Sequence, residues 1–153
     1  MSHKTMPAFM LDTNAFNRAL DKGIDPKTLS GRGHLCITHV QVNELQATKN
    51  SDRLTSLLSV FEAIEQESVP TAAAVWDVSE FGAAEWGGAD GLYDKVLTSL
   101  SKRNNNKDNN VRDVLIGVTA IKRGLTLVTN DRDLATVVRE HGGNSISFEE
   151  LLA

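Results

Sequence analysis

Short apolar runs alternate with longer amphipathic stretches along most of this chain. Four to eight mostly apolar residues between turn-forming residues are typical of the buried strands of a parallel sheet. Runs of this kind predict strands at residues 8–11, 34–38, 125–129 and 145–148. Each of the first three is followed by polar residues and then by a helical pattern.

Apolar residues spaced three and four apart predict helices in the intervening stretches. The clearest apolar face follows Asp52 and consists of Leu54, Leu57, Leu58, Phe61 and Ile64. Further helices are predicted from residue 15 to about Gly23, from His39 through residue 47, over residues 92–100, over residues 114–121 with a Gly124 C-cap, and from residue 134 to about 141. Residues 25–33 and 101–110 are predicted to be loops, and residues 75–78 fit either a strand or a helix start.

Strands that alternate with helices predict an α/β layered domain with a mainly parallel sheet. A length of 153 residues is enough for one sizeable core, so we expect residues 1–153 to form a single domain. The order of the strands within the sheet does not follow from the sequence.

Composition and charge narrow the classes of function. The apolar share of 41% and the charged share of 24% are those of an ordinary globular protein. A net charge of −4 disfavours a protein that coats duplex DNA through many phosphate contacts. No apolar stretch is long enough to span a membrane, and the run near the start is too short for a signal peptide, so we expect a cytoplasmic protein. The single cysteine, Cys36, excludes an intramolecular disulfide and is predicted to be a small buried hydrophobic residue.

Acidic residues follow the predicted strands where those strands end. Asp12 follows the first strand, Asp131 and Asp133 follow the third, and Glu44 lies early in the helix after the second. Taken alone, each has an ordinary interpretation, because Asp is a preferred helix N-cap and most glutamates are solvated. Two acids and Asn130 after one strand are nevertheless more than a cap requires. The carboxyl ends of strands are also where open α/β sheets bind ligands.

Asp113 is the most informative of the acids. With Asn110 as N-cap it would occupy the third helical position, where an acid favours capping. Its neighbours one turn further on are Ile116 and Gly117, so it shares a face with apolar and small residues and is predicted to point toward the interior edge. A carboxylate placed there needs a partner, because an unpaired buried charge is costly.

A divalent cation would provide that partner. Ionised carboxylates that share a small site raise one another's pKa, and a hard cation such as Mg²⁺ or Mn²⁺ relieves the repulsion while preferring oxygen ligands. The sequence has no clustered Cys/His spacing for zinc, no Walker A loop, no dinucleotide-binding glycine pattern and no nucleophile elbow. The residues therefore predict an acidic metal site.

The acidic motifs, taken in order, resemble those of PIN domains, and more narrowly those of the VapC-type ribonuclease toxins of toxin–antitoxin pairs. The matching segments span nearly the whole chain: LDTN at residues 11–14, EL at 44–45, DVLIGVTA at 113–120 and TNDRDL at 129–134. Each motif is weak alone, but four of them in order on an α/β pattern are specific. The resemblance implies a three-layer α/β/α fold with a mainly parallel central sheet.

The resemblance also implies an activity. It indicates a Mg²⁺- or Mn²⁺-dependent endoribonuclease that hydrolyses RNA phosphodiester bonds with metal-activated water. The implied site comprises the catalytic acids Asp12, Glu44, Asp113 and Asp131, the further metal ligand Asp133, and the supporting residues Asn14 and Thr129. The resemblance implies a homodimer and a small antitoxin partner that blocks the acidic pocket.

Other residues leave alternatives open. RNA phosphates are one interpretation, and a solvated loop another, for the basic residues Lys102, Arg103, Lys107 and Arg112. Trp76 and Trp86 fit base stacking, although packing in the core or against a partner is favoured. Rival functions are a metal-dependent DNA nuclease, a Mg²⁺-binding regulatory module resembling a phosphoreceiver, and a non-catalytic RNA-binding relative. The regulatory module would need a lysine at the end of a late strand. The non-catalytic relative would have lost some of the acids.

Overall fold

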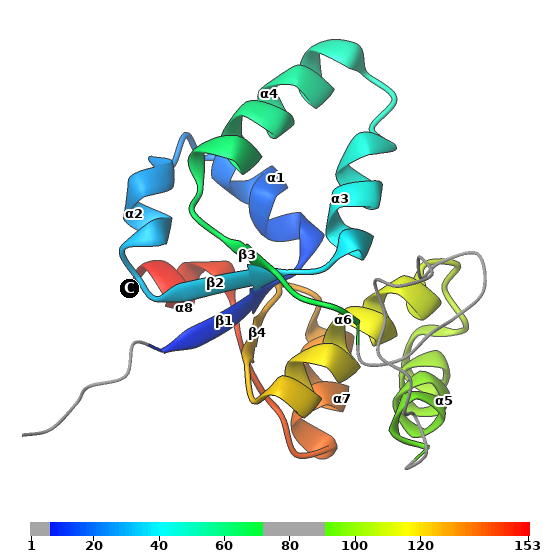
Figure 1. Cartoon of the computed structure of the whole chain (residues 1–153). Coiled ribbons are helices and arrows are strands. Elements are labelled where there is room, and N and C mark those ends of the chain that lie inside the picture. Colours follow the sequence, from blue (N-terminus) through cyan, green and yellow to red (C-terminus); the bar gives the residue numbers. More distant parts are fainter. Residues whose placement is uncertain (1–6, 72–90) are drawn as a thin grey trace, which may run out of the picture.

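The structure is a computed structural model that describes residues 7–71 and 91–153. Within these residues all strands belong to one parallel sheet with the order β3-β2-β1-β4-β5 (Figure 1). The strands are β1 (Ala8–Leu11), β2 (His34–Ile37), β3 (Glu67–Ser68), β4 (Thr126–Val128) and β5 (Asn144–Ile146). The prediction of a mainly parallel α/β sheet is confirmed.

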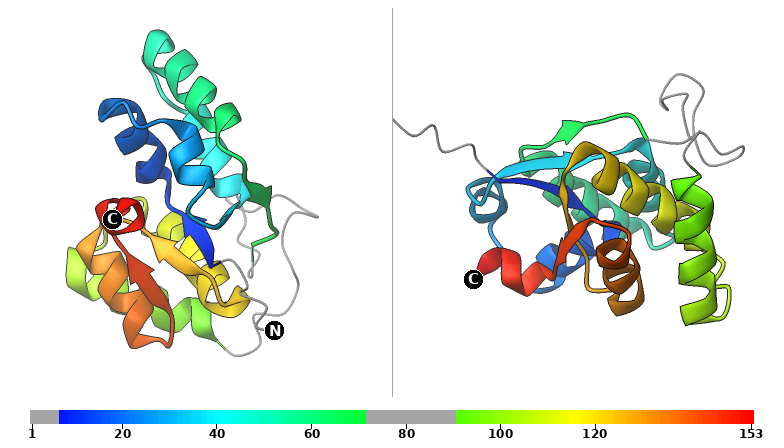
Figure 2. Two further views of the ribbon diagram at one scale, coloured as in Figure 1. Left: turned by 90° about the vertical axis from the view of Figure 1, so that its left-hand side faces the viewer. Right: turned by 90° about the horizontal axis from the view of Figure 1, so that it is seen from below.

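Helices cover both faces of this sheet. They are α1 (Thr13–Asp21), α2 (Pro26–Ser30), α3 (His39–Gln46), α4 (Ser51–Ala63), α5 (Leu92–Asn104), α6 (Asn110–Arg123), α7 (Arg132–Glu140) and α8 (Phe148–Leu152). Helices α5, α6 and α7 contribute to one hydrophobic core, and α1, α2, α4 and α8 contribute to another. Two further views show the sheet between these two groups (Figure 2). The fold is therefore the expected three-layer α/β/α arrangement.

Strands β1 and β2 are apolar on both sides because each side meets a core. Successive side chains of a strand point to opposite faces of the sheet. In β1, Phe9 and Leu11 pack with the α1 group, whereas Met10 packs with the α5–α7 group. In β2, Leu35 packs with the α1 group and Cys36 packs with the α5–α7 group. The continuous apolar runs in the sequence are explained by this two-sided burial.

Two segments differ from the prediction. Residues 25–33 were expected to be loop, but Asp25 caps a short helix, α2, that has Pro26 in its first turn. A strand was expected over residues 145–148, but β5 ends at Ile146. There Ser147 forms a capping box with Glu150 and starts α8, so Phe148 lies in a helix and not in the predicted strand.

Two differences concern boundaries and edges. Helix α5 continues to Asn104 and includes the start of the predicted 101–110 connector. Strand β3 was not predicted, because its two exposed residues, Glu67 and Ser68, carry no apolar signal. The alternatives for residues 75–78, Trp76 and Trp86 lie outside the described residues. No helix among the described residues is long and apolar enough to cross a membrane.

Candidate metal centre

Asp12 lies where the two central strands end. Strands β1 and β4 pair with Leu11 opposite Val128, and the Asp12 backbone N–H continues the pairing with a 3.0 Å hydrogen bond to the Val128 carbonyl. Asp12 is also the N-cap of α1, and its Oδ1 accepts a 2.8 Å hydrogen bond from the Thr13 backbone N–H. The capping interpretation is therefore correct but incomplete, because Asp12 is only 5% exposed and lies at the carboxyl edge of the sheet.

Two side chains orient the other oxygen of Asp12. The Thr129 hydroxyl donates to Oδ2 at 2.7 Å, and the Asn14 amide donates to the same atom at 3.2 Å. Donors on both carboxylate oxygens fix the plane of the group. The supporting positions expected for Asn14 and Thr129 are thus next to Asp12.

Glu44 reaches the same edge from α3. Thr38 and Gln41 form a capping box that starts this helix, and Gln41 Nε2 also donates to the Leu11 carbonyl at 2.8 Å. Helix α3 is in this way tied to the end of β1, and the Thr13 hydroxyl donates to Glu44 Oε1 at 2.9 Å. Glu44 is only partly exposed, so it is not the solvated glutamate of the ordinary interpretation.

The sequence reasoning did not assign roles to Thr13 and Gln41. For Gln41 a signal existed, because Thr followed three residues later by Gln at a helix start is a capping box. That spacing predicts the start of α3, but not the second bond that Gln41 makes to the end of β1.

Asp113 approaches from the opposite face. It lies in the first turn of α6 and is 7% exposed, as its apolar neighbours predicted. The N-cap is Asn109 rather than Asn110. Asn110 is instead buried and exchanges two 2.8 Å hydrogen bonds with Asn104 at the end of α5, which fixes the start of α6. No residue within the described ranges donates a hydrogen bond to the Asp113 carboxylate.

Asp131 is the N-cap of α7. Its Oδ1 accepts hydrogen bonds from the backbone N–H groups of Asp133 and Leu134 at 3.0 and 3.1 Å. Its own N–H donates to the Thr129 hydroxyl at 3.1 Å. One carboxylate oxygen is therefore engaged by the helix, and Thr129 links Asp131 to Asp12.

The electrostatics join these four carboxylates into one site. Burial, together with the charges of Glu44 and Asp131, raises the pKa of Asp12 to about 6 although Thr129 opposes the shift. Burial and the charges of Asp12, Glu44 and Asp131 raise the pKa of Asp113 to about 8. Burial also raises the pKa of Glu44. Such shifts mark carboxylates that lack a positive partner.

Asp133 lies apart from the other four carboxylates. Its side chain faces Arg103 on α5, with Oδ1 3.7 Å from Nε, and 38% of the side chain is exposed. Arg103 also lies 3.6 Å from Glu140, so two carboxylates of α7 compete for it. The charges of Asp12, Glu44 and Asp131 all act on Asp113, while Asp133 pairs with Arg103.

Two of the predicted basic residues lie near the acids. The charge of Lys107 acts on Asp113, and the charge of Arg112 acts on Glu44, in each case lowering the pKa of the carboxyl. Both residues are exposed, as is Lys102 on α5. Of the four predicted basic residues, Lys107 and Arg112 are therefore the ones whose charges act on the carboxylates of the site.

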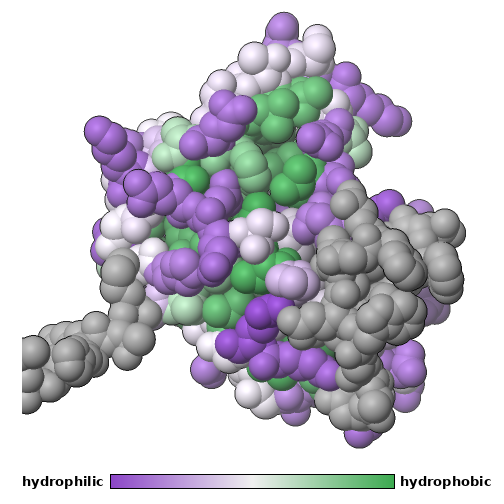
Figure 3. All heavy atoms as spheres, in the orientation of Figure 1, coloured by the Kyte–Doolittle hydropathy of each residue, from purple (hydrophilic) through white to green (hydrophobic). Residues whose placement is uncertain are grey.

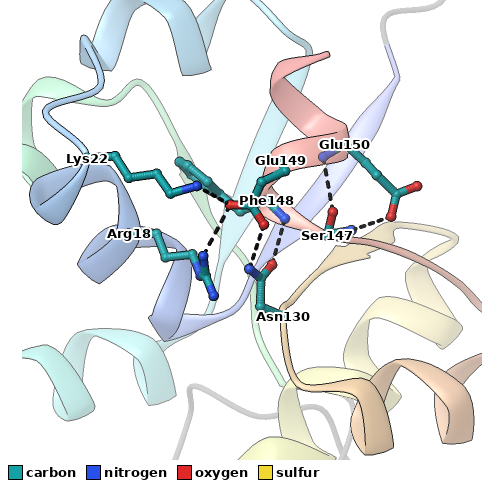
Figure 4. A network of polar contacts seen from close by, with 7 residues as sticks. All are labelled: Arg18, Lys22, Asn130, Ser147, Phe148, Glu149 and Glu150. Carbon is teal, nitrogen blue, oxygen red and sulfur yellow. Dashed lines mark hydrogen bonds and ion pairs between the residues drawn. The ribbon is translucent and has the colours of Figure 1, made fainter.

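A cleft of about 640 Å³ opens beside Thr129 and Asp131. Its wall includes Asn130, whose amide donates to Glu149 at 2.8 Å and whose Oδ1 accepts from the Phe148 N–H at 2.8 Å (Figure 4). Glu149 also binds Lys22, the C-cap of α1, at 2.8 Å and Arg18 of α1 at 3.3 Å. This network fastens the C-terminal helix to the loop that carries Thr129 and Asp131.

The donor set fits a hard divalent cation. The candidate ligand atoms are carboxylate oxygens, which Mg²⁺ and Mn²⁺ prefer. Asn14 Oδ1 is a buried acceptor without a hydrogen-bond partner among the residues that the structure describes, beside the Asp12 carboxylate that its amide contacts. An unsatisfied oxygen next to carboxylates with raised pKa values is what a cation or its bound water would satisfy.

The fold and the site together define the class of this protein. It is an α/β/α domain with acids at the carboxyl ends of its central parallel strands. The chain belongs to the PIN domain family, whose family model matches residues 9–140. No curated protein sequence gives a significant match.

Solved structures share this fold. VapBC2 from Rickettsia felis, bound to a DNA fragment from its promoter, is 20% identical, with 92% of this chain and 98% of that chain covered and a TM-score of 0.55. PAE2754 from Pyrobaculum aerophilum is 18% identical, with coverages of 95% and 93% and a TM-score of 0.56. VapBC-5 from Mycobacterium tuberculosis is 20% identical, with coverages of 92% and 96% and a TM-score of 0.51. At these identities the likeness concerns the fold.

Proposed function

We propose that this protein is a Mg²⁺- or Mn²⁺-dependent endoribonuclease, formed by one domain over residues 1–153, and the toxin of a toxin–antitoxin pair. The observation that carries the proposal is the mutual electrostatic effect of Asp12, Glu44, Asp113 and Asp131, with raised pKa values for three of them. A cation bound among these carboxylates would neutralise the charge that otherwise destabilises the fold.

The residues divide the work of binding. Asp12 and Asp113, the two most buried acids, are the proposed central ligands, and Glu44 and Asp131 complete the site directly or through water. Thr129 and Asn14 hold the Asp12 carboxylate in a fixed orientation. When bound, the cation would activate water and neutralise charge on the phosphate. We leave Asp133 out of the ligand set because it faces Arg103.

The substrate contacts are proposed to come from basic residues beside the acids. Lys107 and Arg112 are exposed and electrostatically coupled to the site, so they are placed to hold phosphates that flank the scissile bond. Lys102 and Arg103 on α5 would extend this surface, although Arg103 is already shared by two carboxylates. Phosphate contacts set affinity and register rather than base preference.

The partners are also proposals. Two of the similar structures are described as VapBC complexes or systems, which supports a small antitoxin for this chain. Hydrophobic residues gather among hydrophilic ones over the region of α4 (Figure 3), where Leu54, Leu58 and Phe61 are partly exposed. Such a surface suits an antitoxin or the second protomer of a homodimer.

RNA cleavage by the purified protein tests the proposal. With Mg²⁺ or Mn²⁺ we expect internal cleavage of single-stranded or structured RNA, complete loss with EDTA, and loss of at least about 100-fold in folded Asp12→Asn. Asp108→Asn is the matched control, because Asp108 is an exposed acid in the loop before α6. Full activity in folded Asp12→Asn would refute the metal-site assignment.

The same assay separates the rival functions. Cleavage of single-stranded or flap DNA in preference to RNA would favour a DNA nuclease at the same site. Cation binding without cleavage of either nucleic acid would favour a regulatory or RNA-binding module.

A further inference from the structure

A second group of metal-binding side chains lies away from the acidic site. It consists of His34, Cys36 and Glu67, where β2 meets the edge strand β3. One ligand atom from each residue, an imidazole nitrogen, the sulfur and a carboxylate oxygen, lies within 4.8 Å of the other two. His34 Nε2 and Glu67 Oε2 are already 2.8 Å apart.

The register of the sheet explains this proximity. His34 and Cys36 are two residues apart on β2, so their side chains lie on the same face. Cys36 pairs with Glu67 in the parallel ladder between β2 and β3, which places the carboxylate beside the sulfur. The face is the one covered by α5–α7, since Cys36 belongs to that core. No local spacing predicts the third ligand, because Glu67 is 31 residues further along the chain.

The group is separate from the acidic site. His34 begins β2, whereas the acids lie beyond the carboxyl ends of the strands. Along α6, Asp113 is in the first turn, while the residue whose charge acts on Cys36 is Arg123 in the last turn. Ten residues of helix separate these positions by roughly 15 Å.

We propose that His34, Cys36 and Glu67 form a zinc site, with water in the fourth position. Thiolate, imidazole and carboxylate are the usual ligands of Zn²⁺ at about 2.0–2.3 Å, which puts neighbouring ligand atoms roughly 3.5 Å apart in a tetrahedral site. Small rotations suffice to reach that spacing, because the side chains of His34 and Glu67 are 52% and 59% exposed. A thiolate is a poor ligand for Mg²⁺ or Mn²⁺, so the two sites differ in the cation they select.

Bound zinc would hold the edge strand β3 against β2. Strand β3 has only two residues and pairs with β2 at two positions. The Cys36 thiol would release its proton to solvent when the zinc–sulfur bond forms. The predicted role is structural: bound zinc stabilises the folded state, and the acidic site does not depend on it.

Cobalt binding to the full-length protein, freed of metal by EDTA and dialysis, tests the site. Co²⁺ bound by a thiolate gives a near-ultraviolet charge-transfer band, and Cys36 is the only cysteine in the chain, so the band reports this site alone. We expect a band that saturates at one Co²⁺ per chain and is displaced by Zn²⁺. At a free zinc concentration about 100-fold above its Kd, we expect Tm to rise by roughly 5–10 °C.

Variants separate the site from a chance thiol complex. His34→Ala and Glu67→Gln change exposed side chains and should each weaken cobalt binding by at least about tenfold. Cys36→Ala should abolish the band, and Glu65→Gln, an exposed acid two residues before Glu67, should leave it unchanged. The site is refuted if no thiolate band forms, or if folded His34→Ala and Glu67→Gln bind Co²⁺ like the wild type.

Discussion

The Thr129 hydroxyl donates a 2.7 Å hydrogen bond to Oδ2 of Asp12, across 117 positions of sequence. The same hydroxyl accepts a hydrogen bond from the Asp131 N–H. One threonine thus orients one carboxylate of the acidic site and positions the backbone of another.

Thr129→Val removes both hydrogen bonds while keeping the β-branched shape. Because Thr129 lowers the pKa of Asp12, we expect the variant to bind Mg²⁺ about 10- to 100-fold more weakly. Isothermal titration calorimetry measures the affinity. Thr126→Val on β4, the strand that Thr129 follows, is the control and should bind as the wild type does. Unchanged affinity in Thr129→Val would show that Thr129 does not support the site.

Asp113→Asn should make the metal-free protein more stable and should lower its RNA cleavage activity. With a pKa of about 8 in the folded state, the Asp113 carboxyl must take up a proton on folding at pH 7, whereas an amide need not, so we expect the metal-free variant to be more stable by on the order of 2 kcal/mol. RNA cleavage should fall by at least about 100-fold. Urea denaturation in EDTA measures the first effect, and Asp108→Asn should change neither quantity. A destabilised Asp113→Asn variant would contradict the view that this acid strains the fold.

The metal-free protein should lose stability as pH rises. The folded-state pKa values of Asp12 and Asp113, about 6 and about 8, lie above the ordinary value of 3.8. Between about pH 4 and 8 the folded state therefore holds more protons than the unfolded state, and the free energy of unfolding falls with pH. Bound Mg²⁺ favours the ionised acids and should flatten this decline.

Urea denaturation at pH 5 and pH 8, with EDTA and with Mg²⁺, measures the slope. A double variant, Asp12→Asn with Asp113→Asn, should show a smaller slope in EDTA than the wild type. An equal slope in the double variant would assign the pH dependence to other groups.

Lys107→Gln and Arg112→Gln test the phosphate contacts. If these residues hold RNA phosphates, each change should raise KM by about three- to tenfold, with little change in kcat. RNA binding should also depend less steeply on salt concentration, because a variant with one phosphate contact fewer releases fewer counterions when it binds. Lys27→Gln on α2 is a charge-matched control. A fall in kcat without a change in KM would point to a role in the chemical step.

Asn130→Ala should loosen the C-terminal helix. The variant leaves the Phe148 N–H without its acceptor and removes the amide that contacts Glu149, so we expect a loss of about 1–3 kcal/mol in the free energy of unfolding. Urea denaturation measures the loss. Asn43→Ala, at an exposed position of α3, should not destabilise the protein. Wild-type stability in Asn130→Ala would show that α8 does not rely on this network.

The sequence by itself determined the local features of the fold. Apolar runs predicted the central strands, because residues buried on both faces of a sheet must be apolar. The positions of Asp12 and Asp131 at strand ends predicted helix caps, since capping involves only neighbouring residues. The apolar neighbours of Asp113 predicted its burial, because helical periodicity fixes which residues share a face.

Only the tertiary structure decided which residues meet. The order β3-β2-β1-β4-β5 places Asp12 beside Thr129, and the bond of Gln41 to the end of β1 brings Glu44 to the same edge. The turn of α7 directs Asp133 to Arg103 instead, and the pairing of β2 with β3 sets Glu67 beside Cys36. Local periodicity cannot specify these contacts, because strand order and register depend on the packing of residues that are distant in sequence.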